Sequence, residues 1–107
     1  MAQNNNLPFH IQKLDRRMNG YGMFSHRLVF THLHSYRSRY QTFLTTRHWF
    51  FENIGLGCEL DMFDLADEYG FKYTWAWDTE GQRLEIFVSE RELSALIMHF
   101  PVDNQAV

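Results

Sequence analysis

The chain has few of the residues that build covalent or membrane-spanning structure. Its 107 residues include one cysteine, Cys58, so no disulfide can form within the chain. Its apolar runs fall far short of the roughly 20 residues that a membrane helix needs. The first residues lack the charged and apolar regions of a secretory signal. We therefore expect a single small domain in a reducing, cytoplasmic environment that makes no contact with a membrane.

The sequence also lacks the spacings typical of catalytic and metal sites. His32 and His34 would share one face of a strand, and Cys58 or Asp61 could add ligands, but a zinc site needs three or four with held geometry. Cys58 could be a nucleophile, yet the acid Glu59 beside it raises a thiol pKa instead of lowering it. Neither a Cys-x-x-Cys nor a His-Glu-x-x-His spacing occurs. We expect no enzymatic activity, no bound metal and no cofactor.

Positive charge is scarce in the second half of the chain, and negative charge is scarce in the first. Residues 1–50 hold seven Lys or Arg and one acid, a balance of +6; residues 51–107 hold three bases and twelve acids, a balance of -9, and the two sum to the net -3. Two interpretations remain open. The halves pack together and neutralise each other, or they present charged surfaces to a partner.

Residues 71–88 predict a β-hairpin. Aromatic side chains alternate with other residues over 71–78, at Phe71, Tyr73, Trp75 and Trp77. This period of two is typical of a strand with one apolar face. Asp78 and Gly81 then have turn chemistry, because Asp can bond its own backbone two residues on and Gly can adopt positive φ. A second strand follows with one face formed by Leu84, Ile86 and Val88.

Two helices are expected on either side of this hairpin. Ser35 to Ile54 has helical apolar spacing, with Ser35 as N-cap and Gly55 placed to end it. Its apolar arc extends to Trp49 and Phe50, beyond what one sheet face needs, which suggests a second contact surface. After the hairpin, Ser89 and Glu92 match a capping box ahead of a helix over residues 90–100, and Pro101 should end that helix.

The remaining segments complete an α+β order. Phe9 to Met18 is expected to be a short helix or an arm that orders on contact, Met23 to Thr31 a strand, and Cys58 to Tyr69 a short acidic helix ending at Gly70. The predicted fold is therefore a single small domain of β-α-α-β-β-α order. A three-stranded antiparallel sheet is packed with helices on one face or split between its faces. We expect a flexible arm over residues 1–22, the domain over 23–101 and a flexible tail over 102–107.

Two surfaces could bind macromolecules. The first joins an acidic segment to the aromatic end of the long helix and would contact a protein partner, through Trp49, Phe50, Glu59, Asp61, Asp64, Asp67 and Glu68. The ordinary alternative for such a charge run is a solvated helix face. The second surface would bind nucleic acid through Lys13, Arg16, Arg17, Arg37 and Arg39, with the aromatic strand 71–77 stacking bases. A pI near 6.0 weighs against it.

The segment Arg47-His48-Trp49-Phe50-Phe51-Glu52-Asn53-Ile54-Gly55, followed by the strands Trp75-Ala76-Trp77 and Leu84-x-Ile86, resembles small proteins of tailed bacteriophages. The resemblance covers about residues 24–100. That family carries no established activity, so the resemblance transfers no functional residue and implies only a phage origin. If the chain is phage-derived, we expect a self-associating accessory protein that binds a host protein in the host cytoplasm and modulates or inhibits it. The alternative is an oligomeric virion component with large apolar surfaces.

Overall fold

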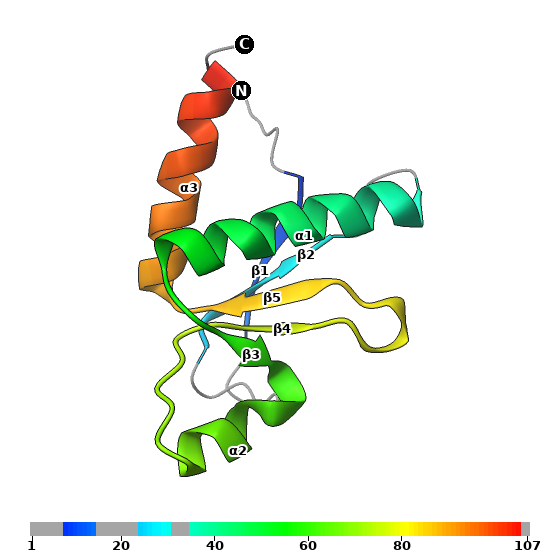
Figure 1. Cartoon of the computed structure of the whole chain (residues 1–107). Helices are drawn as coiled ribbons and strands as arrows, with labels where there is room; N and C mark the ends of the chain where they lie inside the picture. The colour runs from blue at the N-terminus through cyan, green and yellow to red at the C-terminus, as the bar shows by residue number, and fades with distance from the viewer. Residues whose placement is uncertain (1–7, 15–23, 31–34, 106–107) are drawn as a thin grey trace.

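The computed structural model describes residues 8–14, 24–30 and 35–105, which form a five-stranded sheet and three α-helices (Figure 1). In spatial order the strands are β1 (His10–Lys13), β2 (His26–Val29), β5 (Glu85–Val88), β4 (Ala76–Asp78) and β3 (Cys58–Glu59). The helices are α1 (Tyr36–Asn53), α2 (Phe63–Glu68) and α3 (Glu90–Gln105). The α+β class is confirmed. The predicted three-stranded antiparallel sheet is wrong in detail, because the observed sheet has five strands and β3 runs parallel to β4.

The two strands that the sequence does not predict are the edges of the sheet. β1 pairs antiparallel with β2, and beyond its end the Leu14 N–H donates to the Ser25 carbonyl at 2.8 Å. The expected helix or arm is therefore wrong for residues 10–13. All four side chains of β1 are exposed, so no apolar alternation marks this strand. β3 has two residues and begins the segment interpreted as an acidic helix, of which residues 63–68 form α2.

Helix α1 forms where its capping residues and apolar spacing predict it. The Ser35 hydroxyl oxygen accepts from the Ser38 N–H at 3.1 Å, which satisfies one of the helix's free donors. At the other end Gly55, at φ +138°, donates to the Phe50 carbonyl at 2.9 Å. Phe43 and Phe50 are fully buried. Both predicted ends are confirmed.

The sheet separates two hydrophobic cores. The first core contains Phe9, Leu28, Phe30, Phe43, Phe50, Trp75, Leu84, Ile86, Val88 and Leu96. The second contains Phe24, Phe63, Ala76 and Phe87. Neighbouring residues of β5 point to opposite faces, so Ile86 enters the first core and Phe87 the second. Consequently α1 and α3 cover one face of the sheet while α2 covers the other (Figure 1). Of the two predicted arrangements, the helices therefore adopt the one in which they are split between the faces.

The hairpin has its predicted turn, but its first strand is shorter than expected. Asp78 Oδ1 accepts from the Glu80 N–H at 3.0 Å, and Gly81 has φ +62°. Only residues 76–78 pair as β4. Ahead of them the rings of Phe71 and Tyr73 stack at 5.7 Å. Tyr73 packs on the second core and Trp75 lies in the first, so the predicted aromatic strand face does not exist.

Helix α3 follows its predicted start and passes its predicted end. The Ser89 hydroxyl donates to the Glu92 carboxylate, so these two residues do contact each other, through their side chains. The helix continues through Pro101 to Gln105, so residues 102–105 of the expected tail are helical. A proline removes one helical hydrogen bond, but its fixed φ is helical, and here the backbone continues.

Several predictions concern residues 1–7, 15–23, 31–34 and 106–107, which lie outside the described residues. They include those for Arg16, Arg17, His32 and His34. Within the described ranges, no helix combines the length and the apolar character that crossing a bilayer requires.

Candidate functional site

An apolar hollow of about 640 Å³ lies between α2 and the chain that leads into β4. We call it the α2 groove; its lining is Gly57, Cys58, Glu59, Met62, Leu65, Ala66, Tyr69, Phe71, Tyr73 and Trp77. Four of these side chains are apolar or aromatic and yet exposed, Met62 at 45%, Leu65 at 46%, Phe71 at 55% and Tyr69 at 76%. Gathered apolar side chains that remain open to solvent are typical of a binding surface.

Acidic side chains lie on α2 and beside it, and one of them, Glu59, lines the α2 groove. All five residues of the predicted acidic surface are exposed on or beside α2, at Glu59, Asp61, Asp64, Asp67 and Glu68. Asp67 is paired with Lys72, whose Nζ lies 3.2 Å from Oδ1. The structure therefore places an apolar groove beside the predicted acidic residues, which the sequence does not predict.

A second hollow, of about 460 Å³, adjoins the α2 groove. Four carboxylates line it, from Glu59, Asp61, Asp78 and Glu80, together with one cation, Arg83. Glu59 and Trp77 line both hollows. An apolar surface and an acidic one thus meet at the end of the sheet. The joint surface suits a ligand that carries both apolar side chains and positive charge.

Cys58 lies half-buried in the α2 groove and is not activated as a nucleophile. Burial raises the pKa of its thiol, and the nearby carboxylates of Asp61 and Glu59 raise it further. The direction agrees with the expectation from its acidic neighbour. Since the thiolate is the reactive form, this environment lowers the reactive fraction of Cys58.

The two aromatic residues of the predicted protein-binding surface do not lie beside the acidic ones. Phe50 is fully buried in the first core, where its ring stacks on Trp75 at 4.9 Å. Trp49 is half-buried against the same core, 5.6 Å from the His99 ring of α3. Both therefore lie on the sheet face opposite α2, so they cannot form one surface with the acidic residues. The exposed aromatic partners of the acidic residues are instead Tyr69 and Phe71.

The predicted nucleic-acid surface is not gathered in the described part of the chain. Lys13 is exposed on β1 and Arg37 is exposed on α1, while Arg39 is half-buried with its Cζ 5.6 Å from the Tyr36 ring centre. The aromatic strand cannot stack bases as predicted, because Trp75 is fully buried. This arrangement gives the nucleic-acid alternative little geometric support.

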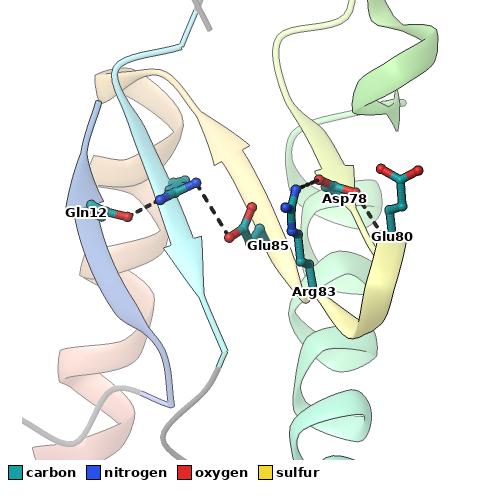
Figure 2. Close-up of polar contacts among 6 residues, drawn as sticks. Gln12, Asp78, Glu80, Arg83 and Glu85 are labelled. Atoms are coloured by element: carbon teal, nitrogen blue, oxygen red, sulfur yellow. Dashed lines mark hydrogen bonds and ion pairs between the residues drawn. The ribbon is translucent and has the colours of Figure 1, made fainter. Parts of the chain in front are cut away.

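A polar network covers the open part of the sheet on the α2 side (Figure 2). The Arg27 Nε donates to Gln12 Oε1 at 2.6 Å, and its Nη1 lies 3.6 Å from the Glu85 carboxylate. Asp78, directly opposite Glu85 in the sheet, pairs with Arg83 at 3.8 Å. Each of these carboxylates thus has a cationic partner. The network therefore resembles a structural lattice of ion pairs more than a catalytic pair.

Glu85 gives this network a testable pH dependence. Burial raises the pKa of its carboxyl above the ordinary 4.5; Arg27 lowers it in part, and Asp78 raises it further. The folded chain therefore holds the Glu85 proton more tightly than the unfolded chain, and this contribution to stability is lost as pH rises from about 4.5 through the folded pKa. We expect Glu85→Gln to remove that loss, so the free energy of unfolding of the variant, relative to native, rises with pH.

Urea denaturation at several pH values between 4.5 and neutrality measures this difference. The same substitution at Glu90, which is exposed on α3, controls for the loss of one charge. A difference between Glu85→Gln and native protein that stays constant over this range would contradict the assignment.

The groove residues that sequence reasoning missed do leave a signal. Met62, Leu65 and Tyr69 follow each other at spacings of three and four, which places them on one face of a helix. Their acidic neighbours obscure this stripe. The alternating pattern of residues 71–78 predicts Phe71 on a strand, and nothing in the sequence indicates that the paired strand begins only at Ala76.

Within the described residues, no group of three or more His, Cys, Asp or Glu side chains is placed to hold a metal ion. Searches of protein-family models, curated proteins and solved structures find no match to this chain.

Proposed function

We propose that this chain is a non-enzymatic protein-binding module whose α2 groove binds a basic, amphipathic segment of a partner protein. The observation that carries the proposal is the exposed apolar groove, which Glu59 lines and which adjoins a hollow with carboxylates from Asp61, Asp78 and Glu80. The resemblance to phage proteins suggests that the partner is a protein of the host cell. In that setting the chain is an accessory protein that occupies a basic segment of a host protein and so inhibits that protein.

Apolar contact would supply most of the affinity. Burying apolar surface contributes about 25 cal/mol per Å², and the exposed Met62, Leu65 and Phe71 offer such surface without rearrangement of either core. Phe71 and Tyr73 already stack on each other, so little side-chain freedom is lost on binding. The groove is therefore suited to the apolar stripe of a helix laid along it.

The acidic residues would supply selectivity and a fast encounter. Five exposed carboxylates attract a cationic segment and repel an acidic one. The adjoining hollow, where Glu59, Asp61 and Glu80 lie beside the Asp78–Arg83 ion pair, suits a lysine or arginine side chain of the partner. Because these charges are exposed, salt should weaken the attraction.

A peptide-binding measurement tests the proposal. The probe is a synthetic amphipathic helix of lysine and leucine, and its counterpart carries glutamate in place of lysine. We expect the lysine peptide to bind, the glutamate peptide not to bind, and Phe71→Ala to weaken the lysine peptide at least about tenfold, which corresponds to about 1.4 kcal/mol.

Met98→Ala is the matched control, because Met98 is equally apolar and 72% exposed but lies on α3, across the sheet from the groove. It should leave the affinity unchanged. Equal weakening by Phe71→Ala and Met98→Ala, or equal binding of the two peptides, would contradict the proposal.

A further inference from the structure

Helix α1 presents a basic, aromatic surface that has the opposite chemistry to the α2 groove. Between residues 36 and 51 it has three arginines and no acid. The rings of Tyr36 and Tyr40 stack at 5.9 Å, and these residues are 41% and 39% exposed. We call the exposed pair Tyr36 and Tyr40 the ridge. Successive helix positions turn by about 100°, so Arg37 and Arg39 lie on either side of the ridge.

The two surfaces cannot meet within one chain. α1 packs on the first core and α2 on the second, at opposite faces of the sheet (Figure 1). The ridge is at the beginning of α1, and the groove lies next to the chain that follows its end. A helix of this length separates the two by about 27 Å at 1.5 Å per residue. The arginines at the beginning of α1 and the acidic residues on and beside α2 therefore lie on opposite faces of the sheet.

We propose that the α2 groove binds the first half of α1 of a second copy of this chain. Tyr36 and Tyr40 would lie against Leu65 and Phe71, with the flanking arginines near the acidic residues of the groove. The inference rests on the proposed function of the groove and names one occupant for it. Each copy offers a different surface on its two sides, so the contact is head-to-tail, and assembly continues until a ring closes or the chain of copies ends.

Two variants and their mixture test this geometry. Glu59→Lys with Asp61→Lys reverses the charge at the acidic edge of the groove, because Glu59 lines the groove and Asp61 lines the adjoining hollow. Arg37→Glu with Arg39→Glu removes the basic side of the ridge, and circular dichroism checks that each variant is folded. We expect the native protein to exceed its monomer mass of 12.9 kDa as concentration rises, by light scattering, and each variant alone to remain a monomer.

The mixture gives the distinguishing result. The groove variant keeps an intact ridge, and the ridge variant keeps an intact groove, so an equimolar mixture should form a 1:1 heterodimer of twice the monomer mass that grows no further. Native protein that stays monomeric at every concentration, a ridge variant that assembles as native does, or a mixture that stays monomeric would overturn the inference.

The lysine–leucine peptide separates this inference from the proposed function. If the ridge variant binds the peptide but no assembly occurs, the groove is a docking site and its occupant is another protein. If the ridge variant binds neither the peptide nor the groove variant, both proposals fail.

Discussion

Replacing Trp75 by alanine should lower the free energy of unfolding by about 3–5 kcal/mol, the usual cost of removing a large aromatic side chain from a packed core. Trp75 is fully buried, with its ring 4.9 Å from that of Phe50 and 5.0 Å from that of Phe51. Its Nε1 also donates to the Gly55 carbonyl at 2.9 Å, which fixes the end of α1. Chemical denaturation followed by circular dichroism measures the change.

Trp77→Ala is the matched control, because Trp77 is two residues away and only half-buried. Its loss should cost clearly less than the loss of Trp75. Equal costs would mean that the side chain of Trp75 is not the centre of the first core. A Trp75→Ala variant that unfolds at the native denaturant concentration would contradict the packing itself.

Gly57→Ala should also destabilise the fold, by about 1–3 kcal/mol, which is the usual cost of overpacking a core. A Cβ at position 57 would lie 2.6 Å from Cε2 of Trp75 and 2.9 Å from its Cδ2. The indole cannot move aside, because it is buried on all sides. Gly57 also lines the α2 groove and directly precedes β3.

The cost of Gly57→Ala should depend on the indole. In a Trp75→Leu background, where the side chain ends before the fused ring, the added methyl group has room, and the two substitutions should be strongly non-additive. Thermal or urea denaturation of the native protein, the two single variants and the double variant gives the coupling. Additive costs would show that Gly57 is needed for another reason.

The sequence predicts those parts of the fold that carry a local chemical signal. Ser35 and Gly55 cap α1 as expected, and Asp78 with Gly81 forms the expected turn. The edge strands carry no such signal. β1 has four exposed side chains and β3 has two residues, so backbone pairing with a neighbour distant in sequence determines both.

The candidate site was predictable in its charge but not in its apolar part. The acidic residues from Glu59 to Glu68 lie close together in sequence, and the structure places them on α2 or directly before it. Trp49 was an attractive aromatic partner for them because it follows helical spacing close by. Whether an aromatic residue is core or surface depends on which sheet face its element covers, and the pattern of α1 alone does not contain that information. Tertiary packing therefore decides that Phe71 is exposed and Phe50 is buried.

The most direct test of the binding groove is an amide chemical-shift titration of the ¹⁵N-labelled protein with the lysine–leucine peptide. The ridge variant, Arg37→Glu with Arg39→Glu, is the protein to label, because self-association would not compete. We expect the shifts to be confined to residues 57–77 and to the turn at 78–80, and to be lost with Phe71→Ala. Shifts centred on α3 or β1, or no saturable shifts at all, would contradict the assignment of the α2 groove as the site at which this protein binds its partner.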